Sequence, residues 1–290
     1  MSAIQVLQTH SSVFIGVIGL LGLLVGSFLN VVVHRLPIMM RREWRKECQE
    51  YLEISEIDTN GCSRFDLIKP DSHCTNCNHT ILPHENIPLL SFIFLKGRCV
   101  NCKSRISLRY PAVELFSAAS SAIVAWHFGF GLQTAFALML TWALISASLI
   151  DLDHQLLPDT IVLPILWLGL LISVIEVFVD SQSSIIGASA GWLCLWLVYH
   201  AFKFATGKEG MGYGDFKLLA LLGAWLGWQV LPIIILLSSL VGAIVGIVLI
   251  LFFRHQRSNP IPFGPFLAAA GWIALLWGDD LTGLYWSIAF

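Results

Sequence analysis

The sequence is poor in charge, because only 12% of its 290 residues are Asp, Glu, Lys or Arg. A soluble domain usually carries about 25%. Hydrophobic residues make up 56% of the chain, which includes 11 Trp, and the mean hydropathy is +0.75. This balance excludes an ordinary soluble globular protein and predicts a polytopic membrane protein.

Two further features are missing. The first apolar run, residues 13–33, has neither a basic segment before it nor a small-residue cleavage site after it. We therefore expect a retained membrane span rather than a signal peptide. The chain also lacks a G-x-G-x-x-G motif between a strand and a helix, so no soluble nucleotide-binding fold is visible.

Long hydrophobic runs are present and define the predicted fold. A membrane-spanning helix needs about 20 apolar residues, and the sequence offers eight candidates: 13–33, 111–130, 132–150, 160–179, 184–203, 216–230, 231–252 and 265–283. Seven or nine spans stay open, because 216–230 is short and joins its neighbour tightly at Pro232. The expected fold is an all-α polytopic membrane protein with about eight transmembrane helices and a small cytoplasmic zinc-binding insert.

The distribution of basic residues predicts the orientation. Twelve of the 17 Lys and Arg lie between Arg35 and Arg109, and with eight spans all 17 fall on one side of the membrane. The insert is too long for the positive-inside rule to be reliable, but the short loops agree with it. We expect the insert and the loops at 151–159, 204–215 and 254–264 to be cytoplasmic. The predicted division is a first span (1–33), the insert (34–110) and a helical bundle (111–290).

Four cysteines in the insert have the spacing of a zinc site. Residues 74–102 contain two C-x2-C pairs separated by 21 residues. Two such pairs can bind one tetrahedral Zn²⁺, although the separation slightly exceeds the usual 15–20 residues and requires a longer connecting hairpin. Redox-active or unliganded thiols are the alternative. The predicted ligands are Cys74, Cys77, Cys99 and Cys102; His73, His79 and His84 are competing candidates.

Other polar features of the insert have simpler interpretations. Cys48, Cys62 and Cys194 lack ligand spacing and are expected to be ordinary reduced thiols. Residues 39–69 indicate a charged helix followed by a loop, whose basic start either contacts anionic headgroups or an acidic partner or forms a solvated face. We favour the solvated face.

Two loops predicted on the same membrane face carry aspartates. Asp151, Asp153 and Asp159 follow the third span, and Asp215 follows the glycine-rich segment GMGYG. Each could simply cap a helix. Two carboxylates on one face instead suit aspartic proteolysis, in which one carboxylate activates water and the other protonates the substrate. Gly210, Gly212 and Gly214 are expected to allow positive φ and close approach of a peptide.

Six ordered blocks of sequence resemble the type IV prepilin peptidases, the GxGD aspartyl proteases that also methylate their product. These blocks are GSFLNVVVHRLP (26–37), the paired CxxC motifs, ENIP with KGRC (85–88, 96–99), ISLRYPAVE (106–114), IDLDHQLLPD (150–159) and GYGDFKLLALLGAW (212–225). The resemblance covers nearly the whole chain. It implies a catalytic pair of Asp151 and Asp215, with Asp153 an acidic neighbour and Asp159 outside the catalytic position.

The resemblance also implies an activity, a location and partners. Family members cut the basic leader of type IV prepilins, or of type II secretion pseudopilins, after Gly on the cytoplasmic face of the inner membrane. They then methylate the new N-terminal residue, usually Phe, with S-adenosylmethionine. Besides zinc and this methyl donor we expect contact with membrane lipid and none with nucleic acid.

The methyl-donor site is the least defined part of the prediction. Gly97 and Arg98, beside Cys99, and the GSFLN segment are candidates. Asn30 and Arg35 have the alternative interpretation of a polar helix end whose cation extends to the membrane surface.

Three alternative functions differ in what they require. A leader peptidase without methyl transfer would leave an unmodified N-terminus. An ion- or proton-coupled transporter should carry acids deep within its spans and often an inverted repeat, whereas this sequence places them at one face and shows no repeat. A zinc-bearing membrane scaffold would need neither Asp151 nor Asp215.

Overall fold

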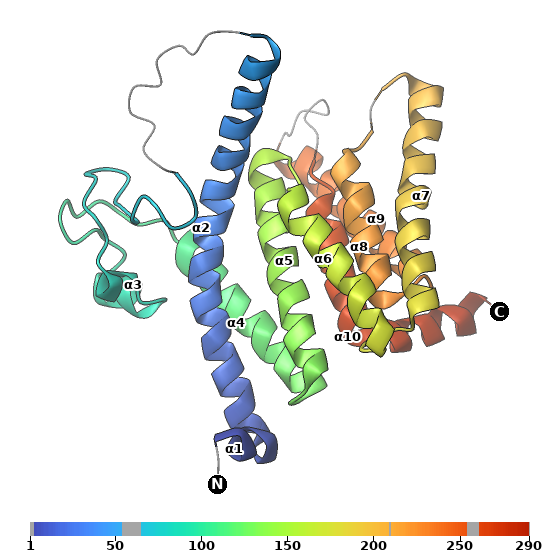
Figure 1. The fold of residues 1–290 in the computed structure, drawn as a ribbon, viewed down its shortest axis with the longest axis horizontal. Coiled ribbons are helices and arrows are strands. Elements are labelled where there is room, and N and C mark those ends of the chain that lie inside the picture. Colours follow the sequence, from blue (N-terminus) through green and yellow to red (C-terminus); the bar gives the residue numbers. More distant parts are fainter. Residues whose placement is uncertain (1–2, 54–64, 209, 254–260, 290) are drawn as a thin grey trace. The chain divides into compact units, whose positions relative to one another are not determined.

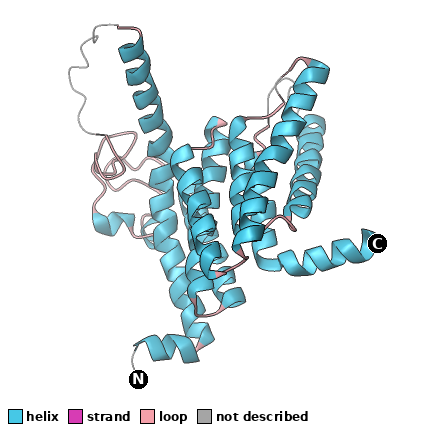
Figure 2. Cartoon of the chain, turned by 45° about the vertical axis from the view of Figure 1, so that its right-hand side comes forward, coloured by secondary structure: helices cyan, strands magenta, loops and turns pink. Residues whose placement is uncertain are grey.

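Helices dominate the part of the chain that the computed structural model describes, residues 3–53, 65–208, 210–253 and 261–289. Within these ranges no strand forms, and only two isolated β-bridges occur (Figure 2). The contacts divide the chain into two compact units, Met1–Phe130 and Gly131–Phe290. The predicted span 111–130 therefore packs with the N-terminal unit. The predicted boundary at residue 111 between the insert and the helical bundle is not tested by these contacts and stays a prediction.

The N-terminal unit is built on two long helices, α2 (Ser11–Tyr51) and α4 (Arg109–Phe128), which pack along each other (Figure 1). Small residues allow the close approach: a Cβ on Gly26 would lie 2.8 Å from the Glu114 Cα, and one on Gly22 would lie 2.7 Å from the Ser121 Cβ. Close packing through glycine is typical of helix pairs in membranes. A short helix, α1 (Ala3–Thr9), precedes α2.

Helix α2 is 41 residues long, so it runs well past the predicted span of 13–33. The charged helix expected after residue 39 is confirmed as its continuation, through Pro37. Residues 54–64, which include Cys62, lie outside the described residues, and so do Arg254 and Arg257, so the predictions for these three residues stay predictions. Between α2 and α4 the insert contains the 3₁₀ turn η1 (Pro83–Asn86) and the short helix α3 (Leu90–Phe94).

The second unit contains the remaining helices: α5 (Leu132–His154), α6 (Asp159–Ile172) with the turn η2 (Ser173–Ile175), α7 (Ser181–Thr206), α8 (Tyr213–Leu226), α9 (Leu231–Phe253) and α10 (Gly264–Ala289). Helix α8 is its core, because every residue from Phe216 to Leu226 except Lys217 is buried. It packs against α7, α6 and α10. Trp225 fixes α6, donating from Nε1 to the Ile165 carbonyl at 2.8 Å.

The eight predicted spans all fall on helices, which confirms the all-α fold. Within the described residues, four helical segments are long and apolar enough to cross a membrane: Ser11–Tyr51, Leu132–His154, Ser181–Thr206 and Leu231–Leu249. Helices α6 and α8 are shorter, with 14 residues each. At 1.5 Å per residue such a helix is roughly 21 Å long, against roughly 30 Å for the hydrocarbon layer. Asp215 therefore lies at the end of a short, buried helix.

Candidate peptidase and zinc sites

Asp151 lies in the last turn of α5, and Asp215 lies in the first turn of α8. Both side chains are buried, each with 6% exposure, and they are close enough for their charges to interact. Two carboxylates separated by 64 positions in the sequence thus meet at the ends of two helices of one unit. Two neighbouring carboxylates can share one proton, because like charges at short range resist simultaneous ionisation.

A third segment completes the surroundings of Asp151. Gly264, the first residue of α10, donates its backbone N–H to the Asp151 Oδ2 at 3.1 Å. A Cβ on Gly264 would lie 2.6 Å from that oxygen, so the position has no room for a side chain. The sequence analysis missed Gly264. Its only local signal is the pair of flanking residues Pro262 and Pro265, which mark a bend before a helix.

The glycine-rich segment acts by size rather than by unusual backbone angles. The expectation of positive φ is wrong for Gly210, Gly212 and Gly214, none of which has one. Gly212 is the N-cap of α8, and Gly214 lies inside its first turn, where a Cβ would come 2.7 Å from the Leu157 Cβ. Asp215 is therefore not the cap itself. The absence of a side chain at Gly214 lets the loop after α5 approach the start of α8.

The other two aspartates of the first loop occupy different places. Asp153 is exposed, as expected of an acidic neighbour. Asp159 does not cap α6, because the N-cap is Pro158 and Asp159 is the first helical residue. Both carboxylate oxygens of Asp159 instead accept hydrogen bonds from Lys217 Nζ at 2.7 Å. This ion pair links the loop after α5 to the first turn of α8, two residues beyond Asp215.

The four predicted zinc ligands cluster in the insert. The Sγ atoms of Cys74, Cys77, Cys99 and Cys102 all lie within 4.8 Å of one another. The Cys74–Cys102 and Cys77–Cys99 Sγ distances are 3.8 and 4.0 Å. Four sulfurs at about 2.3 Å from one Zn²⁺ would be separated by about 3.8 Å, so the donor set fits a tetrahedral ion. The geometry supports a metal centre without identifying the metal.

The two cysteine pairs are supported by equivalent turns. Each second cysteine is followed by a residue with positive φ, Asn78 or Lys103, whose N–H donates to the carbonyl of the first cysteine. Bridges His73–Thr80 and Arg98–Arg105 close the two turns. The longer connection required by the 21-residue spacing contains η1 and α3.

Polar groups around the sulfurs favour the thiolate at Cys102, whereas burial and the neighbouring thiols raise the pKa of Cys77 to about 11. Asn76 and Asn101 point their amide nitrogens at the Cys102 and Cys77 sulfurs, each at 3.7 Å. The Ser104 hydroxyl lies 3.0 Å from the Cys102 Sγ, and its hydrogen bonds lower the pKa of Cys102 to about 5. Such outer contacts orient metal ligands. None of the competing histidines is needed: His79 Nε2 instead lies 3.3 Å from Glu85 Oε2.

Arg35 and Asn30 hold the insert against the long helices. Arg35 is buried at 7% exposure and donates from Nη1 to the carbonyls of Asp66 and Leu67 at 3.1 and 3.3 Å. The alternative of a cation extending from a helix end is therefore wrong, because α2 continues past it. Asn30 Nδ2 donates to the Tyr110 carbonyl at 3.1 Å and so connects α2 to the start of α4.

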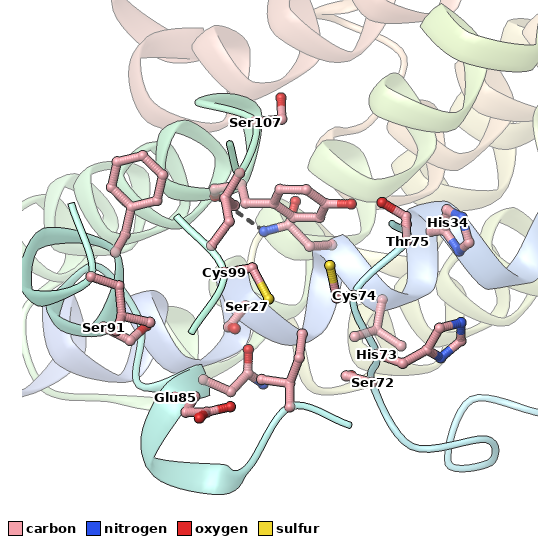
Figure 3. Close-up of a pocket in the computed structure, with 18 of the residues that line it drawn as sticks. Ser27, His34, Ser72, His73, Cys74, Thr75, Glu85, Ser91, Cys99 and Ser107 are labelled. Atoms are coloured by element: carbon pink, nitrogen blue, oxygen red, sulfur yellow. Dashed lines mark hydrogen bonds between the residues drawn. The ribbon is translucent and has the colours of Figure 1, made fainter. Parts of the chain in front are cut away.

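Among the predicted methyl-donor candidates, Ser27 and Asn30 of the GSFLN segment line a cavity of about 440 Å³ in this unit, whereas Gly97 and Arg98 are not among its lining residues (Figure 3). Gly97 is buried with φ +64°, and a Cβ there would lie 2.8 Å from Phe92 Cζ, a ring that lines the cavity. Arg98 is exposed. Figure 3 shows Cys74 and Cys99 with their sulfurs close together in this cavity, with Ser27 and His34 on α2. The cavity thus adjoins the cysteine cluster.

Comparison with known proteins covers both units. A family described as the bacterial peptidase A24 N-terminal domain matches residues 20–128, and the type IV leader peptidase family matches residues 138–247. No solved structure matches the chain.

Curated relatives match it from end to end. The prepilin leader peptidase/N-methyltransferase of Stutzerimonas stutzeri is 53% identical over 289 residues, covering 100% of this chain and 99% of the relative. The protein of that name from Pseudomonas aeruginosa is 54% identical with the same coverage, and the one from Aeromonas hydrophila is 56% identical over 274 residues, 94% and 93% of the two chains. The chain belongs to the prepilin leader peptidase/N-methyltransferase family.

Proposed function

We propose that this protein cleaves the basic leader from type IV prepilins, type II secretion pseudopilins or both, and then methylates the new N-terminal amine. Cleavage follows Gly on the cytoplasmic face of the inner membrane, and the methylated residue is usually Phe. The methyl donor is S-adenosylmethionine, and the four cysteines hold a structural Zn²⁺. The single observation that carries the peptidase is the buried pair of Asp151 and Asp215 at the ends of α5 and α8.

The pair performs the reaction by dividing two roles. One carboxylate takes a proton from a water molecule, which attacks the carbonyl carbon of that Gly, while the other donates its proton to the carbonyl oxygen. Collapse of the tetrahedral intermediate breaks the C–N bond and returns a proton to the leaving amine. The Gly264 N–H orients the Asp151 carboxylate for this exchange.

The surroundings also argue against ion transport. Both aspartates lie in terminal helical turns rather than midway along α5 or α8. The family's relatives are named for a peptidase and a methyltransferase. We place the two aspartates, the insert and the loops at 151–159, 204–215 and 254–264 in the cytoplasm, because the basic residues of the short loops favour that side.

Intact mass spectrometry of a prepilin incubated with membranes tests this function. The wild type should remove the leader and add one methyl group, about 14 mass units. Asp151→Asn and Asp215→Asn should each abolish cleavage at unchanged expression, while Asp153→Asn, in the same loop, should retain it. Cleavage by either of the first two variants would rule out the aspartyl mechanism, and cleavage without methylation would remove the transferase.

A further inference from the structure

The cavity in the N-terminal unit contains a buried acid without a cationic partner. Glu114 of α4 lines the cavity and is 8% exposed. Its Oε2 accepts the Leu89 N–H at 2.8 Å, and its carboxylate also accepts a hydrogen bond from the Ser27 side chain. Among the described residues no Lys, Arg or His forms an ion pair with it. The nearby Arg35 gives its Nη1 to the Asp66 and Leu67 carbonyls.

A buried carboxylate is costly unless it is paired. One backbone N–H and one hydroxyl group satisfy only part of its capacity to accept hydrogen bonds. The remaining capacity faces a space that is large enough for a small molecule, since ligand pockets measure about 300–1,000 Å³. The arrangement therefore calls for a cation supplied by a ligand.

The other walls suit a nucleoside. Aromatic rings of Phe65, Phe92 and Tyr110 offer apolar faces, and hydroxyl groups of Ser72 and Ser107 are among the polar ones. A flat base can stack on the rings, while sugar hydroxyls need hydrogen-bonding groups. The labelled serines of Figure 3 come from the insert and from α2, so the cavity presents polar groups from several segments.

We propose that this cavity is the methyl-transfer site and that Glu114 is its ammonium-binding residue. The inference rests on the proposed function. Two reactants carry an ammonium: the methionyl end of S-adenosylmethionine and the new N-terminus of the cleaved pilin. Once the pilin amine has lost a proton to water, its lone pair forms the N–C bond, and the C–S bond breaks with its electrons passing to sulfur. Glu114 binds one of the two ammonium groups beside the atoms between which the methyl group is transferred.

The test uses the purified full chain in detergent and its Glu114→Gln variant. Glutamine keeps a carbonyl oxygen for the Leu89 N–H and removes the charge. Isothermal titration with S-adenosylhomocysteine, which keeps the methionyl ammonium, measures binding without catalysis. Methylation of a pre-cleaved pilin peptide at saturating donor measures the acceptor. Loss of a buried charge pair should weaken one of the two by at least about thirtyfold.

Each outcome is decisive. A raised Kd for S-adenosylhomocysteine assigns Glu114 to the donor, and an unchanged Kd with a raised KM for the peptide assigns it to the acceptor. If neither changes, the inference is wrong. Ser117→Ala, one turn along α4, is the matched control and should change neither.

A second pair of variants tests the cavity even if Glu114→Gln fails to fold. Val31→Phe adds a ring to a residue that lines the cavity, and Val32→Phe adds the same ring to the next residue of α2, which does not. Only Val31→Phe should weaken S-adenosylhomocysteine binding, and equal binding by both variants would overturn the proposal. Prepilin cleavage is measured for every protein in these experiments. A wild type that fails to cleave refutes the proposed function. A wild type that cleaves but does not bind S-adenosylhomocysteine refutes the methyl-transfer site and leaves the peptidase standing.

Discussion

Gly264→Ala is the sharpest perturbation of the aspartate pair, because it adds one methyl group and removes no functional group. The new Cβ would lie 2.6 Å from the Asp151 Oδ2 and 3.3 Å from the Leu157 Cδ1. Carbon and oxygen atoms in ordinary contact are about 3.4 Å apart or more, so the carboxylate or the start of α10 must move by roughly 0.4–0.8 Å. The movement also stretches the hydrogen bond from the Gly264 N–H.

The expected loss follows from the sensitivity of catalysis to position. A displacement of about 1 Å can cost about a hundredfold in rate, so kcat for prepilin cleavage should fall by about ten- to a hundredfold. KM should change little, because the leader is not expected to bind in the space that the new methyl group fills. Alanine is a better helix former than glycine by about 1 kcal/mol, which favours a folded variant.

The assay is the initial rate of leader removal from a purified prepilin in detergent, followed by gel shift and mass. Gly283→Ala is the matched control, because it lies in the same helix and a Cβ there would meet nothing within 4 Å. Methylation of a pre-cleaved peptide should be unaffected in both variants. A Gly264→Ala protein that cleaves within twofold of the wild type would show that the contact with Asp151 does not position the catalytic group.

Three further predictions concern other contacts. Lys217→Ala should slow cleavage by at most about fivefold, because an ion pair this exposed is worth about 0.2–1 kcal/mol. A double-mutant cycle with Asp159→Asn should show that the two losses are non-additive. Additive losses would disprove the functional role of the Lys217–Asp159 ion pair. Cys77→Ser should reduce bound zinc, measured by plasma mass spectrometry, from about one ion per chain to near zero. Cys194 is an exposed thiol of the other unit, so Cys194→Ser should keep the zinc. Retained zinc in Cys77→Ser would rule out the four-sulfur site. Asp180 caps α7 by accepting the Ser183 N–H at 2.9 Å, and this hydrogen bond lowers the pKa of Asp180. The ionised cap stabilises the fold fully at neutral pH, and this stabilisation disappears as the pH falls below the ordinary aspartate range. Asp180→Ala should therefore lower the melting temperature at pH 7 but not at acidic pH, and an equal loss at both would contradict the role of the charge.

The parts of the fold that depend on local pattern could be predicted from the sequence. Each apolar run became a helix, because an unbroken hydrophobic stretch in a membrane protein has few other ways to satisfy its backbone. The cysteine spacing likewise predicted the cluster, since each C-x2-C pair forms its own tight turn. Asp151 and Asp215 were predicted by their position at the ends of runs.

The errors concern contacts made across long stretches of sequence. Arg35 looked like a cation at a helix end, but α2 continues for 16 more residues, to Tyr51, and buries it against the carbonyls of Asp66 and Leu67. Asp159 looked like a helix cap, but its carboxylate forms an ion pair with Lys217, 58 positions away. Gly264 and Asp151 are separated by 113 positions. No spacing rule within a segment encodes which distant groups will meet.

The chemistry of the two proposed reactions fixes their order. The amine that accepts the methyl group exists only after the peptide bond has been cut, so cleavage must come first. Glu114→Gln should accordingly accumulate cleaved, unmethylated pilin, and a single-turnover experiment with the wild type should show methylation lagging behind cleavage. Methylated pilin that still carries its leader would contradict this order.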